Sequence, residues 1–406
     1  MTKRAKVAKL AVALAACSVV AGVGCGSDDA SGAASVGGSA GSSGAASAGG
    51  SAGSRGGGVA CEGEARANLT ERIAFAPQPD VRAGKGDSFP IAGVLLGDEI
   101  VFLTEKLWLL PKTGGSPRVM ATLPEDVSGL LFGVGGDRVV LFTATTGAIQ
   151  VVSKNGSMQT LTAFGSKQPT PSTPLLRPYA GVRDGALQGL TVIPETDTAP
   201  ARIVAVSRDL ATDAETDLGY APNGYRCGVG APSLAMGGIV ALCSTAGFCK
   251  VSGGTCKLLR FSTKGAEAEV FDTPAGLSNP SLIGVLGNDA IITGLGVGEE
   301  KVPLLAVPLT AGGASRELAR YTRKEFESVD PGRLVDGGLL APGSRDLFIP
   351  EGGGAIVETA IFADGALPKP AFSILLGADG CAIYRVQIET SPSLTYQFVR
   401  TPIGSP

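Results

Sequence analysis

The chain contains no histidine, few charged residues and few aromatic ones. Among its 406 residues, Asp, Glu, Lys and Arg make up 17% and Phe, Trp and Tyr 5%. Histidine is the side chain whose ordinary pKa lies nearest neutrality, and it is the commonest metal ligand. Its absence excludes Ser-His-Asp and Cys-His catalytic sites, His-ligated zinc and haem held by a proximal histidine. Acid–base chemistry by paired carboxylates stays open, although no local pattern selects two of them.

The chain also lacks a strong charge of either sign. It has 34 basic and 37 acidic residues, a formal net charge of −3. Loss of residues 1–24 would remove four positive charges and no negative one, which leaves a more acidic chain. Net acidity disfavours nucleic acid. No glycine-rich phosphate motif stands in the required register. We therefore expect no nucleic-acid partner and no cofactor.

The first 25 residues predict an export signal. Four basic residues precede an apolar stretch over 10–24, which is shorter than the ~20 residues of a membrane span. Cys25 follows this stretch directly, and the arrangement resembles the signal of bacterial lipoproteins. The resemblance implies that Cys25 becomes the lipidated first residue of the mature chain. Two alternatives stay open: Cys17, which follows Leu-Ala-Ala, and secretion without a lipid.

A low-complexity spacer follows the signal. Residues 26–58 consist almost wholly of Gly, Ser and Ala, a composition that has nothing to bury and predicts a disordered linker. We therefore expect three parts: a signal peptide over 1–24, the lipid-anchor cysteine and linker over 25–59, and a folded domain over 60–406.

The folded part contains short strand-like runs separated by turn residues. Gly, Asp and Asn pairs precede apolar runs at intervals of roughly 40–50 residues, which is the period of a propeller blade. These pairs begin at Gly97, Gly136, Asp184, Gly237, Asn288, Asp336 and Asp379. We predict an all-β fold, a β-propeller of about seven blades, with six or eight blades or a β-sandwich as alternatives. Residues 72–76 are expected to complete the last blade, and only 315–329 shows an ambiguous helical periodicity.

A second repeated phrase ends in a glycine turn. Leu-Pro-Lys-Thr-Gly-Gly at 110–115 matches Val-Pro-Leu-Thr-Ala-Gly-Gly at 307–313, and Ser-Lys-Asn-Gly at 153–156 is a looser copy. Each predicts a hairpin whose glycines supply positive φ. The phrase resembles the repeat of bacterial TolB-like and related extracytoplasmic propellers, in which a strand ends in Pro-Lys-Asp-Gly-Gly; here Thr113 replaces the Asp. The resemblance implies a fold rather than an activity.

Six cysteines lie beyond the linker, and an even number in an exported chain indicates disulfides. They are Cys61, Cys227, Cys243, Cys249, Cys256 and Cys381. Cys249 and Cys256 flank a Ser-Gly-Gly turn that would place them across a hairpin. Cys61 and Cys381 lie at the two ends of the domain, which meet where a ring closes. Cys227 and Cys243 then remain as the third pair. A metal site on these thiols is disfavoured because their spacing departs from C-x2-C pairs.

The densest acidic stretch holds the one candidate for a calcium site. Asp213, Glu215 and Asp217 alternate along it, and Ca²⁺ takes oxygen ligands from such loops. The twelfth residue from Asp213 is Gly224 rather than a glutamate, so a solvated loop between strands is the favoured interpretation. The sequence indicates no other metal site.

These features together predict a lipid-anchored, extracytoplasmic β-propeller that serves as a binding or scaffold module at the bacterial cell envelope. An outer-membrane lipoprotein is the expected location, and the expected partner is an envelope protein or a glycan. We expect a monomer that contacts the membrane through its lipid. The alternative is a propeller hydrolase or lyase that cleaves polysaccharide through carboxylates.

Overall fold

The computed structural model divides the chain at Glu64, and every described residue belongs to the second part, Ala65–Pro406. The described residues are 71–74, 92–104, 106–123, 129–135, 137–143, 149–161, 179–183, 185–193, 202–232, 238–245, 256–296, 300–322, 332–335, 337–342, 345–351, 353–360, 372–379, 381–389 and 395–403. Within these ranges no helix is long and apolar enough to cross a membrane.

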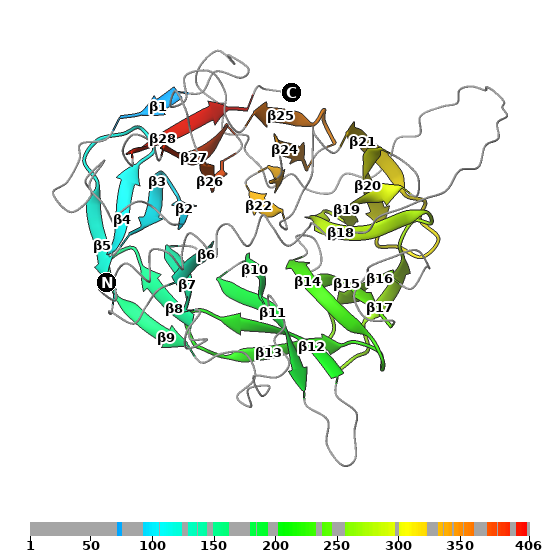
Figure 1. The fold of residues 1–406 in the computed structure, drawn as a ribbon. Helices are drawn as coiled ribbons and strands as arrows, with labels where there is room; N and C mark the ends of the chain where they lie inside the picture. Colours follow the sequence, from blue (N-terminus) through cyan, green and yellow to red (C-terminus); the bar gives the residue numbers. More distant parts are fainter. Residues whose placement is uncertain are drawn as a thin grey trace, which may run out of the picture. The chain divides into compact units, whose positions relative to one another are not determined.

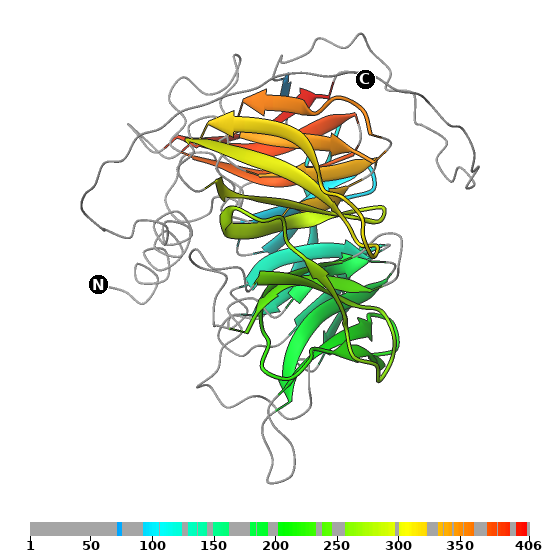
Figure 2. The same ribbon diagram turned by 90° about the vertical axis from the view of Figure 1, so that its right-hand side faces the viewer.

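Seven four-stranded antiparallel sheets form the fold, which confirms the predicted seven-bladed β-propeller. Blade 1 is built from β2 to β5, blade 2 from β6 to β9, blade 3 from β10 to β13 and blade 4 from β14 to β17. Blade 5 is built from β18 to β21, blade 6 from β22 to β25, and blade 7 from β26 to β28 with β1. The first strand of each blade lies nearest the centre of the ring (Figure 1). Figure 2 shows the same sheets from the side.

Most strands have four to eight residues, in keeping with the short runs of the sequence. The strands of blades 1 to 4 are β2 (Ala92–Leu96), β3 (Glu99–Leu103), β4 (Lys106–Pro111), β5 (Arg118–Thr122), β6 (Gly129–Gly135), β7 (Arg138–Thr143), β8 (Ile149–Ser153), β9 (Met158–Leu161), β10 (Tyr179–Arg183), β11 (Ala186–Ile193), β12 (Arg202–Asp209), β13 (Glu215–Tyr220), β14 (Arg226–Pro232), β15 (Ile239–Ser244), β16 (Cys256–Phe261) and β17 (Glu269–Asp272).

The strands of blades 5 to 7 follow the same pattern. They are β18 (Leu277–Leu286), β19 (Asp289–Gly296), β20 (Lys301–Pro308), β21 (Arg316–Thr322), β22 (Arg333–Val335), β23 (Gly338–Ala341), β24 (Arg345–Pro350), β25 (Val357–Ala360), β26 (Phe372–Ala378), β27 (Ala382–Glu389), β28 (Thr395–Pro402) and β1 (Glu71–Ile73). The stretch 315–329, which was ambiguous in sequence, contains strand β21 because its residues pair with β20 over Lys301 to Ala306.

The hydrophobic core is divided among the junctions between blades. Each of the seven apolar clusters combines side chains from two neighbouring blades. Buried and exposed residues do not alternate regularly along the middle strands. In β15, for example, all six residues are buried. A strand that is covered on both faces by neighbouring sheets needs apolar side chains on both. Trp108 belongs to such a core: it is 3% exposed and stacks on Phe102, as predicted for blade packing.

A recurring hydrogen bond explains why two turn motifs repeat in the sequence. In blade 1 the N–H of Lys112, just after the third strand, donates to the carbonyl of Asp98 in the turn between the first two strands, with 2.9 Å between N and O. In blade 6, Glu351 donates to Gly337 at the same distance. We call the donor residue the junction position. Among the described residues it is occupied by Lys112, Lys154, Leu210, Leu309, Glu351 and Ile403.

The turn that follows the junction position contacts the backbone at the outermost strand of the preceding blade. Gly115 donates its N–H to the carbonyl of Ala74, just after β1, at 2.8 Å. Gly114 has φ of +90°, and a Cβ there would lie 2.4 Å from the Ala74 oxygen. Gly156 of blade 2 approaches the Met120 carbonyl of blade 1 in the same way. Glycine is needed at these turns both for positive φ and for close backbone approach.

Strand β1 closes the ring. It pairs antiparallel with β28, so that a strand from the start of the domain completes the blade built by its end. Ile73 faces Phe398 in this register and is 4% exposed. The prediction that a segment at 72–76 completes the last blade is therefore confirmed, with the described strand spanning Glu71–Ile73.

Candidate binding recess between blades 5 and 6

The side chain at the junction position fills the gap between its own blade and the preceding one. Leu210, Leu309 and Ile403 are at most 5% exposed, and each belongs to an apolar cluster shared with the preceding blade. A buried leucine or isoleucine in this place seals the junction at its turn end.

Lysine occupies the same position in blades 1 and 2, where it forms an ion pair with the preceding blade. Lys112 Nζ lies 2.6 Å from Asp379 Oδ2 of blade 7, and Lys154 Nζ lies 2.5 Å from Glu99 Oε2 of blade 1. The lysine stem crosses the junction and its ammonium group meets a carboxylate on the other side. Lysine side chains commonly cover apolar surface with the stem while the charged end stays polar.

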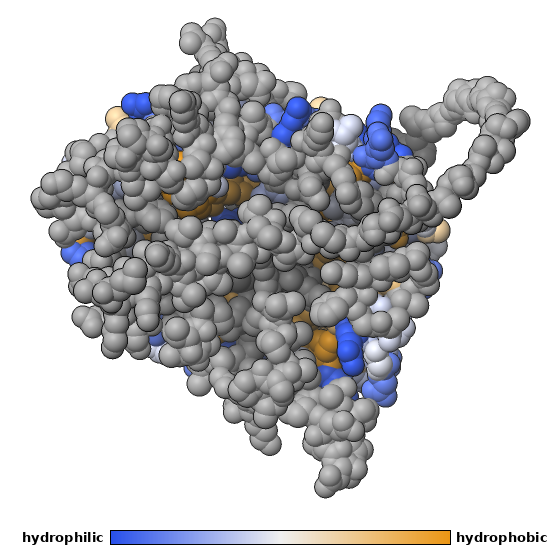
Figure 3. Space-filling model, in the orientation of Figure 1, coloured by the Kyte–Doolittle hydropathy of each residue, from blue (hydrophilic) through white to orange (hydrophobic). Residues whose placement is uncertain are grey.

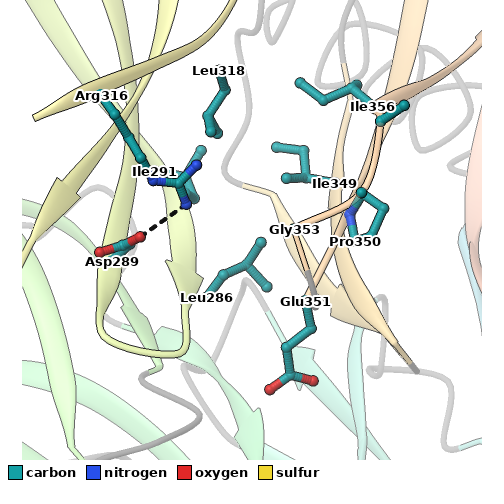
Figure 4. A pocket seen from close by; sticks show the side chains of 12 residues that line it. Leu286, Asp289, Ile291, Arg316, Leu318, Ile349, Pro350, Glu351, Gly353 and Ile356 are labelled. Carbon is teal, nitrogen blue, oxygen red and sulfur yellow. Dashed lines mark hydrogen bonds and ion pairs between the residues drawn. The ribbon is translucent and has the colours of Figure 1, made fainter. Parts of the chain in front are cut away.

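Blade 6 departs from this pattern because its junction position is Glu351, an acidic residue in place of the apolar or basic ones. A recess of about 170 Å³ lies there between blades 5 and 6. Its lining consists of Leu286, Asp289, Ile291, Arg316, Leu318, Ile349, Pro350, Glu351, Gly353, Gly354, Ala355 and Ile356. Apolar side chains from both blades form the interior, and Glu351 projects at the edge (Figure 4). The recess lies at the end of the junction that is nearest the turn. Five other blades have a lysine, leucine or isoleucine side chain at the equivalent position.

The charges of the recess come from three residues. Arg316 Nη2 lies 3.1 Å from Asp289 Oδ2, and both residues belong to blade 5. Arg316 is 59% exposed and Asp289 25%, so the pair lies at the solvent side of the recess. Glu351 approaches from blade 6 and has no ion pair among the described residues. The recess therefore carries one negative charge beyond the Asp289–Arg316 pair.

In the space-filling view, several hydrophilic residues lie along the outline of the molecule, and strongly hydrophobic ones are visible in the hollows between them (Figure 3). Large exposed apolar residues among those described are Val119, Met158 and Val270, one each on three outer strands. Singly scattered apolar residues are ordinary for a protein surface, so the recess is a more specific feature than any of them.

A second polar cluster lies where blade 7 meets blade 1. Tyr384 Oη donates to Asp379 Oδ2 at 3.0 Å, and Lys112 Nζ lies 5.1 Å from the Tyr384 ring centre. Burial opposes ionisation of Asp379, but the hydrogen bond and charge of Lys112 outweigh it and hold the pKa of Asp379 below its usual range. Burial, reinforced by the Asp379 charge, raises the pKa of the Tyr384 phenol. These shifts belong to the junction between blades 7 and 1, which Lys112 crosses.

An arginine binds two of the three candidate calcium ligands, in the stretch for which a loop without metal was favoured. Asp213 Oδ1 and Glu215 Oε2 accept hydrogen bonds from Arg208 at 2.8 and 2.6 Å. Asp217 Oδ1 instead accepts the N–H of Gly219 at 2.5 Å. Two of the three carboxylates are thus neutralised by one buried guanidinium on β12. No group of three potential metal ligands occurs among the described residues.

The cysteines divide into one confirmed pair, one correction and several that lie outside the described residues. Cys227 and Cys243 form a disulfide between directly opposite positions of β14 and β15, as predicted. Cys256 carries a free thiol, so the predicted bridge to Cys249 is wrong. In the described part of this hairpin, Cys256 pairs in register with Ser244 of β15. Cys249 falls within the connection between β15 and β16, outside the described residues.

The two ends of the domain carry the remaining thiols. Cys381 is disulfide-bonded, and its predicted partner Cys61 lies outside the described residues. The Cys61–Cys381 pairing therefore stays a prediction. The two candidate lipidation sites, Cys25 and Cys17, also lie outside the described residues.

Sequence reasoning missed the recess residues Asp289, Arg316 and Glu351. A signal was present: Pro-Glu-Gly-Gly-Gly at 350–354 matches Pro-Lys-Thr-Gly-Gly at 111–115, with glutamate in place of lysine. The match acquires a meaning only from the tertiary structure, in which the lysine side chain crosses the junction between two blades.

Several solved structures are similar to this chain at low sequence identity. No family model matches the chain, and no curated protein matches it. An oligogalacturonate lyase in complex with manganese has a TM-score of 0.48 at 11% identity, over 83% of this chain and 98% of that chain. A virginiamycin B lyase from Staphylococcus aureus has a TM-score of 0.45 at 12% identity, over 82% of this chain and 99% of that chain.

A third similar structure is YCF48 bound to D1 peptide, with a TM-score of 0.41 at 10% identity, over 82% of this chain and 100% of that chain. At such identities the shared feature is at most the fold, and the activities of these proteins do not transfer to this chain.

Proposed function

We propose that this protein is an envelope-tethered β-propeller that binds a partner protein at the recess between blades 5 and 6. One observation carries the proposal: the junction that Lys112 or Leu309 fills in other blades is left open at Glu351. At the other five positions that make the junction hydrogen bond, the side chain packs in an apolar cluster shared with the preceding blade or pairs with a carboxylate there. At this position a recess of side-chain size remains.

The size and lining of the recess favour binding of a protruding side chain. At about 170 Å³ it is smaller than the ~300–1,000 Å³ of pockets that enclose small molecules. Its apolar interior and charged edge are the combination that anchor residues occupy in protein interfaces. Cleavage of polysaccharide by two carboxylates, the alternative from the sequence, finds less support here because Asp289 is held by Arg316.

The tether rests on the sequence. The signal-like first 24 residues and Cys25 support a lipid anchor, and the Gly/Ser/Ala spacer over 26–58 has a root-mean-square span of about 30 Å. Such a spacer would hold the propeller clear of lipid headgroups and leave its recess accessible to another envelope protein.

Site-specific photo-crosslinking in intact cells tests the binding function. A photoreactive residue at Ala355, which is exposed and lines the recess, is expected to yield one dominant protein adduct. The matched control carries the same residue at Lys264, in the exposed turn that follows the third strand of blade 4. Adducts of equal pattern from both positions, or none from Ala355, would contradict the proposal.

Metabolic labelling with a fatty-acid analogue tests the tether. The full-length protein is expected to incorporate label and to fractionate with membranes, and Cys25→Ala is expected to abolish both. Cys17→Ala serves as the control and is expected to retain both. Label that persists in Cys25→Ala and disappears in Cys17→Ala would move the anchor to Cys17.

A further inference from the structure

Resting on the proposed function, we infer that the occupant of the recess is a lysine side chain of the partner protein. The protein contains two internal precedents for this occupant. Lys112 and Lys154 cross the corresponding junctions, and each ends on a carboxylate of the preceding blade. The partner would supply in trans what blades 1 and 2 supply in cis.

The junction between blades 1 and 2 is the closest precedent because its charged groups occupy equivalent places. Glu99 opens the second strand of blade 1 and Arg118 opens the fourth, with Arg118 Nη2 lying 3.0 Å from Glu99 Oε1. Lys154 of blade 2 then contacts the other oxygen of Glu99. Three groups thus form one cluster: a carboxylate, an arginine and a lysine.

The recess repeats two of these three groups. Asp289 opens the second strand of blade 5 and Arg316 opens the fourth, and they form the same ion pair. Where blade 2 has Lys154, blade 6 has Glu351. The replacement changes the cluster from net positive to net negative, so the recess lacks a cation that its counterpart contains.

The apolar interior suits the stem of a lysine. Leu286, Ile291 and Ile349 are at most 8% exposed and belong to one cluster shared by blades 5 and 6. Four methylene groups can lie along such a surface while the ammonium group meets Glu351 at the edge. A neutral apolar side chain would satisfy the interior and leave Glu351 without a partner, and an acidic one would be repelled.

Methyl NMR with two small probes tests the chemistry. N-acetyl-lysine methylamide is expected to shift the methyl signals of Ile349 and Ile356 in the full propeller. N-acetyl-norleucine methylamide has the same stem without the charge and is expected to bind about tenfold more weakly, since a hydrogen bond to a charged group is lost. Equal affinity of the two probes would overturn the inference, because apolar contact alone would then explain binding.

Substitutions at position 351 test the same contact. Glu351→Gln is expected to reduce affinity for the lysine probe about tenfold, and Glu351→Lys is expected to abolish binding while raising the thermal unfolding midpoint, because the new side chain would fill the recess in cis. Glu300→Lys makes the same charge change at an exposed residue before β20, at the opposite end of the blade, and is expected to leave binding unchanged. Undiminished probe binding by folded Glu351→Lys would overturn the inference.

The two proposals fail in different ways. If the Ala355 adduct forms and survives Glu351→Lys, the partner binds there without a lysine, and only this inference is overturned. If the lysine probe binds but no protein adduct forms at Ala355, the recess binds an amine that does not come from a protein. That result would overturn the proposed function, and with it the inference that the lysine belongs to a partner protein. Loss of the adduct in Glu351→Lys and its retention in Glu300→Lys would support both.

Discussion

Among the described residues, the most deeply buried charged pair lies between blades 6 and 7. Arg385 of β27 and Asp346 of β24 form an ion pair, and their side chains are 4% and 1% exposed. Burial and the nearby Arg333 lower the pKa of Arg385 to about 9, which leaves it protonated at neutral pH beside Asp346. A second arginine–carboxylate pair, Arg345 with Glu358, lies on the surface of the same blade. The two pairs have similar chemistry and very different solvation.

Removal of one partner should expose this difference. Asp346→Ala leaves a buried guanidinium unpaired and is expected to lower the free energy of unfolding by about 3–5 kcal/mol. Glu358→Ala removes a surface partner and is expected to cost about 0–1 kcal/mol. Denaturant titration measures both. Replacing the buried pair together, by Asp346→Leu with Arg385→Met, should restore part of the loss; a double variant no better than Asp346→Ala would show that the pair is not the cause.

The carboxylates at the filled junctions predict loss of stability in acid. Burial opposes ionisation of Glu99, yet hydrogen bonds from Lys154 and Arg118 outweigh it and hold the pKa of Glu99 below its usual range; Lys112 does the same for Asp379. A carboxylate whose pKa is lower in the folded state stabilises the fold above its unfolded pKa, and this contribution disappears as the pH falls through the folded value.

We therefore expect the thermal unfolding midpoint to fall as the pH is lowered from about 5 towards 3. The variant Lys112→Met with Lys154→Met should show a shallower decline over that interval, because both carboxylates lose their lysine partners. Lys264→Met, an exposed control, should follow the original protein. Identical slopes in all three would refute a role for these pairs.

At the scale of elements, the hairpin turns connect one blade to the next. Gly114 combines positive φ with a carbonyl oxygen that a Cβ would meet at 2.4 Å, whereas Gly97 has φ of +58° and open space around it. Both turns read alike in the sequence, as glycine beside a polar residue. The structure separates a glycine that supports a turn from one that also allows a neighbouring backbone to approach.

Alanine substitution should distinguish these two glycines. Gly97→Ala is expected to cost about 1–2 kcal/mol, the strain of a left-handed backbone. Gly114→Ala adds displacement of the Ala74 carbonyl and is expected to cost more, with weakened pairing of β1 to β28. Equilibrium unfolding gives the cost, and amide hydrogen exchange in β28 reports the pairing. Equal cost and equal exchange would mean that the turn does not support the closing strand.

At the scale of the molecule, the ring depends on joining its first and last strands. β1 contributes three residues to blade 7, and Arg400 Nε lies 2.6 Å from Glu71 Oε2 across that pairing. So short an edge strand gains little from its own hydrogen bonds. The predicted Cys61–Cys381 disulfide would add a covalent connection near the same closure.

Non-reducing peptide mapping tests this connection. We expect a peptide that links Cys61 to Cys381, a second that links Cys227 to Cys243, and alkylation of Cys256 in the native protein. In the chain-entropy model a disulfide that closes a loop of 100 residues stabilises by about 4.7 kcal/mol, and a longer loop by more. Reduction should therefore lower the unfolding midpoint more than Cys227→Ser with Cys243→Ser does. Alkylation of Cys61 in the native protein would contradict the predicted Cys61–Cys381 disulfide.

Much of the fold could be predicted because its signals are local. The turn pairs beginning at Gly97 and Asn288 and the glycine phrases at 110–115 and 307–313 act within a few residues, through φ preference and hairpin geometry. Their period indicated the blades, and a segment near 72–76 was left over to close the ring. The Cys227–Cys243 pair followed by elimination, whereas the Cys249–Cys256 pair failed because hairpin register depends on the whole sheet.

The sequence therefore determined the blades, because strand and turn propensities are properties of neighbouring residues. The absence of histidine excluded classes of catalytic site but located no binding site. Only the tertiary structure placed the carboxylate of Glu351, which has no ion pair among the described residues, at the recess between blades 5 and 6. Glu351 is one acidic residue among 37 in the sequence. It becomes distinctive because folding places it at a position where five other blades have a lysine, a leucine or an isoleucine, and that equivalence exists only between segments brought together by the ring.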